Sequence, residues 1–137
     1  MPNLQRTTLN PANAPKPLGA YSHAVKVSPG SLLYIAGQVG VDSNGSLVGP
    51  DVGAQTRQVF QNIGHVLAGA GATFANVVEF TTYLVGRSSI QPFIEARTQL
   101  FPSLFPNGDY PPNTLLVISG LVQEELLVEI KAVAALP

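Results

Sequence analysis

The sequence predicts an α+β fold in a single domain spanning residues 1–137, with one sheet and two helices packed on one of its faces. Two segments carry apolar residues at helical spacing, and five runs rich in β-branched and aromatic residues predict strands. The predicted order is ββαβαββ, in which strands and helices do not alternate strictly. This order favours an α+β arrangement over a parallel α/β sheet, and 137 residues is an ordinary length for one domain.

The first 20 residues are predicted to form an extended lead-in, because four of them are proline. Residues 24–27 and 32–39 are predicted strands. The segment Ser28-Pro29-Gly30-Ser31 between them is a turn signal and predicts a hairpin that joins the two strands. A second turn is predicted at Asp42-Ser43-Asn44-Gly45.

A first helix is predicted to begin at Asp51 and to end near Ala70. Asp51 is a good N-cap, because its carboxylate can accept hydrogen bonds from the free amides at the helix start. Gly69 and Gly71 favour the end of the helix. The apolar stripe that predicts this helix consists of Val52, Val59, Ile63, Val66 and Ala70.

The second half of the chain is predicted to hold one helix and three strands. The β-branched and aromatic run at 77–85 predicts a strand. A helix follows over residues 89–104, and strands at 114–119 and 126–134 come after a loop rich in proline, glycine and asparagine. The apolar face of this second helix consists of Ile90, Phe93, Ile94, Leu100, Phe101 and Leu104.

The composition predicts an oligomer and disfavours several classes of partner. Charged residues make up only 11% of the chain, against roughly 25% in typical soluble domains, while hydrophobic residues make up 45%. Seven dispersed Lys and Arg residues argue against nucleic-acid binding, and no apolar run reaches the length of a membrane span. With no Cys and two His, no metal site is expected, and the lack of Cys is typical of a reducing, cytoplasmic setting.

Three segments resemble the signature blocks of the RidA/YjgF family of reactive-intermediate deaminases. They are residues 18–25 (LGAYSHAV), 34–40 (YIAGQVG) and 128–134 (VEIKAVA), and their order and spacing match those of the family over nearly the whole chain. One block alone would be weak, but three in register are specific. The resemblance implies a fold like that of trimeric chorismate mutase, with a barrel-like core in a homotrimer and an active site in each cleft between subunits.

The resemblance also implies a reaction. Family members hydrolyse small reactive enamines and imines that pyridoxal-phosphate enzymes form, and they release ammonia and a keto acid without a cofactor. The implied catalytic residues are Glu129 and Tyr21, and Gly37 is an implied substrate-binding position. Glu129 and backbone carbonyl groups would hold the attacking water, while Tyr21 would line the pocket. A single carboxylate can take a proton from water and return it to the departing amine.

The sequence departs from the family pattern where the substrate carboxylate would bind. Family deaminases carry an arginine 15 positions before the glutamate, and Thr114 stands at that position here. Threonine cannot form the charged, bidentate contact that arginine makes with a carboxylate, which predicts affinity for amino-acid-derived imines lower by on the order of a hundredfold. Two further implied substrate-binding positions are the apolar residues Leu116 and Ile94.

Arg97 interrupts the apolar stripe of the second predicted helix. A buried arginine must find an anion or reach solvent along its stem. Two interpretations remain open. Arg97 forms an intersubunit ion pair or extends to solvent, or it binds substrate and partly replaces the cation missing at position 114.

Other candidate residues also have a structural interpretation. Glu129 on a strand can pair with a neighbouring side chain, and the ring of Tyr21 can cover a sheet edge. His23 is interpreted as a structural histidine. His65 lies off the apolar stripe of its helix and is expected to be solvated.

Three functions are therefore considered. The first is hydrolysis of an enamine or imine, which Glu129 and Tyr21 favour. The second is a non-deaminating role, in which the protein binds an apolar small metabolite or acts on a related carboxylate-free substrate, and Thr114 favours this. The third is ribonuclease activity, which is the weakest because basic residues are few and dispersed.

Overall fold

A computed structural model describes residues 4–28 and 30–137 of the chain. Pro2 of the predicted lead-in and Pro29 of the predicted turn lie outside the described residues. Eight main elements follow one another, with a single-turn 3-10 helix before β4 (η1, Phe74–Asn76) and another before α2 (η2, Arg87–Ser89). In chain order they are β1 (Gln5–Leu9), β2 (Ala24–Ser28), β3 (Ser31–Val39), α1 (Val52–Gly69), β4 (Val77–Val85), α2 (Ile90–Leu104), β5 (Asn113–Ile118) and β6 (Val128–Leu136).

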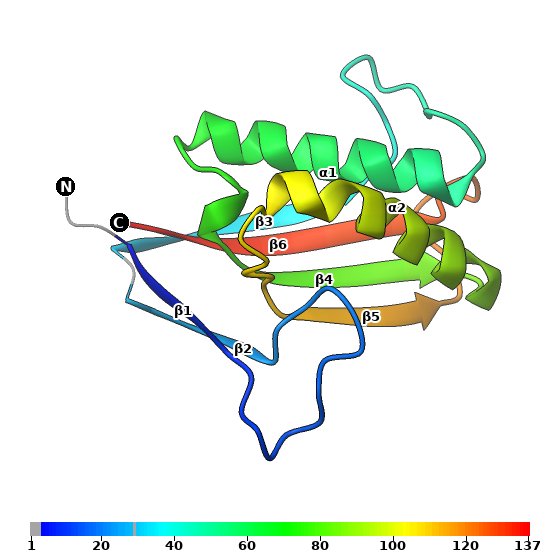
Figure 1. Cartoon of the computed structure of the whole chain (residues 1–137). Coiled ribbons are helices and arrows are strands. Elements are labelled where there is room, and N and C mark those ends of the chain that lie inside the picture. The colour runs from blue at the N-terminus through cyan, green and yellow to red at the C-terminus, as the bar shows by residue number, and fades with distance from the viewer. Residues whose placement is uncertain (1–3, 29) are drawn as a thin grey trace.

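The two helices lie side by side on one face of a four-stranded sheet (Figure 1). The strand order is β3-β6-β4-β5, in which β4 and β5 are parallel and the other neighbours are antiparallel. The predicted α+β fold with both helices on one face is therefore confirmed. No helix of residues 4–28 and 30–137 covers the opposite face of this sheet, and β5 forms one of its edges.

The predicted hairpin between the strands at 24–27 and 32–39 is wrong. β2 pairs with β1, in a separate two-stranded ribbon that lies away from the helices, whereas β3 pairs with β6 (Figure 1). Strand lengths match within each pair, with five residues in β1 and β2 and nine in β3 and β6. The amide of Gly30 donates to the carbonyl of Leu136, which directs the chain onto β6 as soon as β2 has ended.

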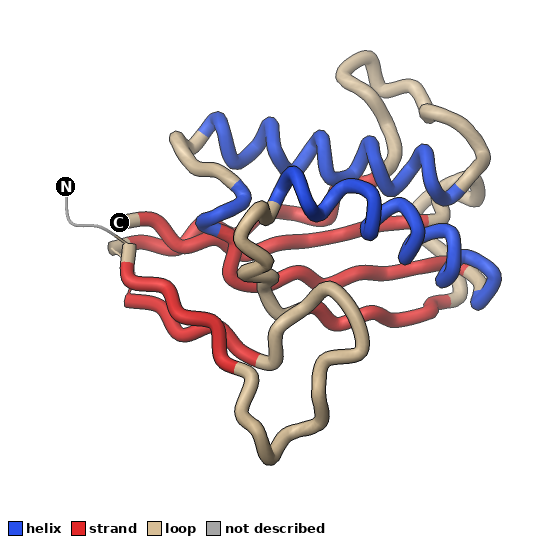
Figure 2. Tube along the Cα trace, viewed as in Figure 1, coloured by secondary structure: helices blue, strands red, loops and turns tan. Residues whose placement is uncertain are grey.

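The ribbon also corrects the predicted lead-in, because residues 5–9 form a strand within it. This strand, QRTTL, is short and polar, so its sequence carries little β signal. Residues 10–20 of the predicted lead-in belong to a long loop between β1 and β2 that extends beyond the sheet (Figure 2). The observed order of main elements is therefore βββαβαββ.

The start and end of α1 agree with the prediction. The Asp51 carboxylate accepts a hydrogen bond from the Ala54 amide at 2.9 Å, and the chain leaves the helix through Gly71 at a φ of 72°. The predicted stripe is only partly correct, because Val66 and Ala70 are exposed. The buried stripe runs instead through Val59, Ile63 and Leu67, which are four positions apart, and the other buried apolar side chains of α1 are Val52 and Phe60.

The core lies between the helices and the sheet, and an aromatic cluster holds α2 in place. Phe101 of α2 meets Phe60 of α1 edge to face at 5.3 Å between ring centroids, and it meets Phe105 at 5.0 Å. Phe80 of β4 contacts the same rings. This packing fixes the rotation of α2 about its axis, and with it the direction of Arg97. Among the described residues, no helix is both long enough and apolar enough to cross a membrane.

Candidate functional site

Glu129 projects from the sheet face that the helices leave uncovered. Side chains alternate along β6, and Val128 and Ile130 are fully buried beneath the helices. Glu129 is half-buried on the other side, between its paired residues Val39 of β3 and Tyr83 of β4. The carboxylate is thus held by a central strand while one side of it remains open.

The side chain of Glu129 lies over the backbone of Gly37. A Cβ atom at position 37 would stand 2.7 Å from Cδ of Glu129 and 2.9 Å from its Cγ, so glycine is needed for this close approach. The register between β3 and β6 shifts between Ile35 and Gln38, which indicates a β-bulge. Bulges interrupt the ladder, re-aim side chains and are common beside active sites. The bulge and the glycine together make the space that the carboxylate occupies.

The position that would bind a substrate carboxylate lies on the same sheet face. Thr114 and Leu116 are both exposed on β5. Leu116 pairs with Tyr83, which is also the β4 partner of Glu129. Four predicted site residues therefore share one face, and position 114 brings no charge to it. These four residues, Glu129, Gly37, Thr114 and Leu116, are called the open-face site below.

The other predicted site residues meet elsewhere. A pocket of about 280 Å³ lies where α2 and β5 meet the loop that leads to β2. Asn113 and Leu115 alternate with Thr114 along β5, so they point to the helix side of the sheet. This cavity is called the β5-edge pocket, and it is lined by Leu18, Gly19, Tyr21, Ile94, Arg97, Asn113 and Leu115.

Arg97 is buried in the β5-edge pocket, with 8% of its surface exposed. Its guanidinium carbon lies 5.3 Å from the ring centre of Phe93 and 6.0 Å from that of Phe101, one helical turn before and after it. Its Nε atom is buried and has no hydrogen-bond partner within residues 4–28 and 30–137. The stem and Nε of Arg97 are therefore shielded from solvent, and both predicted interpretations of this residue remain open.

The electrostatic setting of Arg97 follows from this burial. Loss of hydration lowers the pKa of Arg97 below its ordinary value, and the nearby Tyr21 hydroxyl opposes that shift. An arginine remains cationic even so. The hydroxyl of Tyr21 accepts a hydrogen bond from the Leu18 amide at 3.1 Å, which fixes the tyrosine at the pocket wall.

Sequence reasoning missed Gln55, a fully buried residue of α1 that supports the open-face site. Its Oε1 accepts a hydrogen bond from the Leu127 amide at 2.9 Å, two residues before Glu129. Its Nε2 donates to the carbonyls of Gly49 and Glu125, each at 3.0 Å. The sequence did hold one indication of this role. Gln55 comes three residues after Val52, which places a side-chain amide inside the apolar stripe of the helix.

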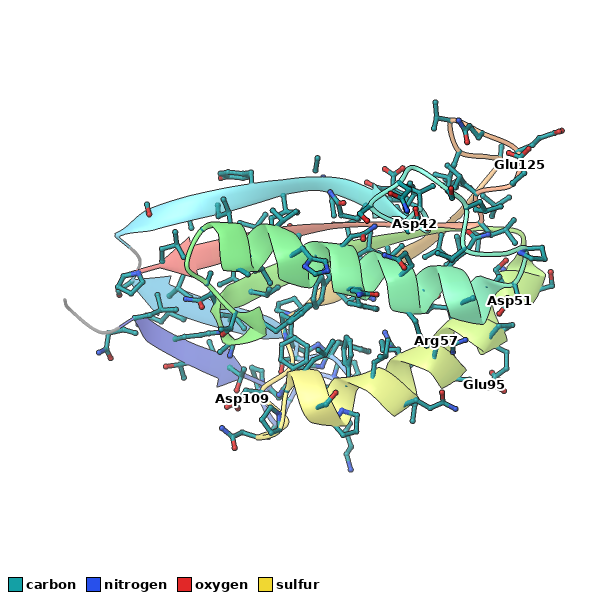
Figure 3. All side chains as sticks on the ribbon, turned by 90° about the horizontal axis from the view of Figure 1, so that it is seen from above. Asp42, Asp51, Arg57, Glu95, Asp109 and Glu125 are labelled. Atoms are coloured by element: carbon teal, nitrogen blue, oxygen red, sulfur yellow. The ribbon has the colours of Figure 1, made fainter. Side chains whose placement is uncertain are left out.

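Neither the two histidines nor the groove between α1 and α2 forms a site comparable to the open-face site or the β5-edge pocket. The ring of His23 bonds the Pro15 carbonyl, as a structural histidine would, and His65 is exposed as predicted. Among the described residues, no three His, Asp or Glu side chains gather as metal ligands would. Figure 3 looks down on the helices and shows Arg57 of α1 and Glu95 of α2 at the groove between them. The exposed Arg57 therefore has an acidic residue near it, in contrast to Arg97.

Comparisons with known proteins cover all of these residues. The family described as Endoribonuclease L-PSP matches residues 11–136, a stretch that contains every predicted site residue. A RutC family protein from Pyrococcus horikoshii is 36% identical over 123 residues, covering 89% of this chain and 91% of that protein. A human 2-iminobutanoate/2-iminopropanoate deaminase is 38% identical over 107 residues, covering 77% of each protein.

Solved structures agree with the sequence matches. YyfB from Yersinia pestis, a protein of unknown function in the conserved Rid family, superposes with a TM-score of 0.86 at 38% identity. The match covers 96% of this chain and 98% of that one. A member of the YjgF/YER057c/UK114 family from Mycobacterium tuberculosis superposes with a TM-score of 0.64 at 30% identity, covering 96% of this chain and all of that one.

Proposed function

Because this chain belongs to the RidA/YjgF family, we propose that it hydrolyses small reactive imines and enamines, with Glu129 as the residue that positions and deprotonates water. The observation that carries the proposal is the Glu129 carboxylate held over Gly37 at the β-bulge. This arrangement gives a half-buried base with one open side, beside backbone groups that the bulge frees from the ladder. The human relative's name, an imine deaminase, supports the same chemistry.

The proposed reaction needs one group that both accepts and donates a proton. Glu129 takes a proton from water as the water oxygen bonds to the imine carbon, and it delivers that proton to nitrogen. The product of this step carries a hydroxyl and an amino group on one carbon. Transfer of the hydroxyl proton through Glu129 to nitrogen then breaks the carbon–nitrogen bond and releases ammonia and the carbonyl product. Within one subunit Tyr21 lies in the β5-edge pocket, so these transfers use Glu129 alone.

The proposed substrate is small, and its carboxylate contributes little at the open-face site. Thr114 can offer only a hydroxyl where an arginine would offer a charged fork. Imines with and without a carboxylate should therefore be hydrolysed with similar kcat/KM. This preference would distinguish the protein from a deaminase that depends on carboxylate recognition.

A homotrimer is proposed as the working assembly. Large apolar side chains stand exposed on strands of the four-stranded sheet, with Leu32 at 45% and Tyr34 at 75% on β3 and Leu116 at 45% on β5. Exposed apolar surface of this kind is typical of a protein interface. Equilibrium sedimentation at micromolar concentration should give three times the mass of one chain, and a stable monomer would contradict the proposal.

The activity is tested by ammonia release from freshly generated 2-iminobutanoate and 2-iminopropanoate and from an imine of butanone, which lacks a carboxylate. Release should exceed the spontaneous rate for all three, with comparable kcat/KM. If none of the imines is hydrolysed faster than without protein, the proposed reaction is wrong. A non-deaminating binding role would then take its place.

A further inference from the structure

We propose that the β5-edge pocket is a binding site for a small monocarboxylate with a short apolar chain, and that Arg97 recognises its charge. The pocket lies on the helix side of β5, whereas the residues of the open-face site point to the other side. The proposal therefore does not depend on Glu129 acting as a base. It concerns a second site in the subunit.

The first argument is the state of the arginine. Arg97 is more than nine-tenths buried, lines a cavity, and has an Nε–H group with no acceptor within the described part of the chain. A buried donor without a partner costs free energy, and a buried charge costs more, unless a ligand supplies the missing acceptor. The rings of Phe93 and Phe101 stabilise the cation from two sides but accept no N–H···O bond. The arginine is therefore held ready for an oxyanion.

The second argument is the set of donors around the cavity. Asn113 Oδ1 accepts a hydrogen bond from Thr82 at 2.8 Å, which leaves the Nδ2 amide group free to donate. The Tyr21 hydroxyl accepts from Leu18, so its own proton can be given to a ligand. Together with the guanidinium of Arg97, these groups each offer a hydrogen-bond donor. A carboxylate offers acceptors only, and its two oxygens match the fork of an arginine.

The third argument limits the ligand to a monoanion of small size. Leu18, Ile94 and Leu115 give the pocket an apolar wall, and Arg97 is the one charged residue among the described residues that line it. A phosphate dianion would call for further cations or more donors. The volume of about 280 Å³ lies at the lower limit of ordinary ligand pockets. One cation, an apolar wall and a small cavity together favour a short aliphatic carboxylate.

Gly19 keeps the pocket mouth close to the arginine. A Cβ atom at position 19 would stand 3.2 Å from Nη2 of Arg97, so the loop backbone passes directly over the guanidinium. This contact screens the charge from water and strengthens its attraction for an anion. It also explains how a residue of an exposed loop can shape a buried site.

The test measures binding of butanoate to the full-length protein by isothermal titration calorimetry, with butanamide as the neutral probe of the same shape. Butanoate should bind saturably and butanamide at least tenfold more weakly. Arg97→Gln should weaken butanoate binding by at least about tenfold, because a charge-assisted hydrogen bond is lost. Arg97→Lys should fall between the two, since a lysine keeps the charge but not the fork. Arg57→Gln, which removes an exposed arginine, should bind as the wild type does.

A second variant keeps the test decisive if Arg97→Gln does not fold. Asn113→Asp preserves the shape of the side chain but places a carboxylate beside Arg97, and it should likewise reduce butanoate binding at least tenfold.

Equal binding of butanoate and butanamide, or equal butanoate binding by wild type and Arg97→Gln, would overturn the proposal. So would an absence of butanoate binding combined with loss of the oligomer in Arg97→Gln, because Arg97 would then be an intersubunit ion-pair residue. Glu129→Gln should bind butanoate normally, which separates this outcome from failure of the proposed hydrolysis.

Discussion

The open-face site and the β5-edge pocket place their charged groups in opposite conditions. Glu129 is half-buried on a central strand, above the backbone of a glycine, with one side open. Arg97 is buried between two aromatic rings, and its Nε has no partner among the described residues. A base that must exchange protons with water needs access, whereas a cation that recognises an anion gains from exclusion of water. The two sites are thus suited to two different tasks, proton transfer and charge recognition.

The largest expected effect concerns Glu129, the proposed base of the open-face site. Glu129→Gln keeps the shape of the side chain and its hydrogen-bonding capacity but removes the proton acceptor. The kcat/KM for imine hydrolysis should fall by roughly 10² to 10⁴-fold, as is typical when general acid–base catalysis is lost. The melting temperature should change little, because an exposed strand ion pair contributes at most about 1 kcal/mol. An active wild type with an equally active Gln variant would remove Glu129 from the mechanism.

The space above Gly37 provides a sharper test of the same site. Gly37→Ala would bring a methyl group against the Glu129 side chain, and the flexible carboxylate end would move aside. Displacement of a catalytic group by about 1 Å can cost about a hundredfold in rate, so kcat/KM should fall by that order. Stability should fall only slightly, because a side-chain end moves and the backbone does not.

The matched control for Gly37→Ala is Gly120→Ala. A Cβ atom at position 120 meets nothing within 4 Å, so this variant should keep full activity. If Gly37→Ala retains the wild-type rate, then the reaction does not depend on the position of the Glu129 carboxylate over the bulge. Steady-state ammonia release from both variants gives the comparison directly.

The open-face site has no cation at position 114, and a single substitution can introduce one there. Thr114 is exposed, and Thr114→Arg would introduce a charged fork on the same face as Glu129. The ratio of kcat/KM for 2-iminobutanoate to that for the imine of butanone should rise by about tenfold or more. Thr114→Gln supplies length without charge and should leave the ratio unchanged. Equal ratios in the two variants would show that position 114 does not face the substrate carboxylate.

The two sites differ in how far the sequence could relate their residues. The resemblance to the family relates Thr114 to Glu129 by a spacing of 15 positions, and alternation along β5 then places Leu116 on the same side as Thr114. The β5-edge pocket joins a loop, a helix and a strand, and no local pattern brings Tyr21 to Arg97. Periodicity predicted both helices, and the residue type predicted the Asp51 cap, because these are local features. It could not predict that β2 pairs with β1, because a strand pattern does not name its partner.

The smallest expected effect tests whether an unpartnered buried polar atom by itself indicates a ligand. Thr56 Oγ1, like Arg97 Nε, is buried without a hydrogen-bond partner among the described residues, but Thr56 is fully enclosed on the face of α1 that packs in the core. Its hydroxyl carries no charge, so its desolvation costs far less than that of a guanidinium. Thr56→Val removes the hydroxyl at nearly constant shape and should stabilise the protein by about 1 kcal/mol, or raise the melting temperature by about 4 °C. Butanoate binding and imine hydrolysis should both equal those of the wild type.

A loss of stability would mean that the hydroxyl is bonded after all, for example to a buried water, whereas altered butanoate binding would mean that the pocket extends beneath α1. With both properties unchanged, the difference between Thr56 and Arg97 rests on charge and on the cavity beside it, which are the two features that mark the β5-edge pocket as a site.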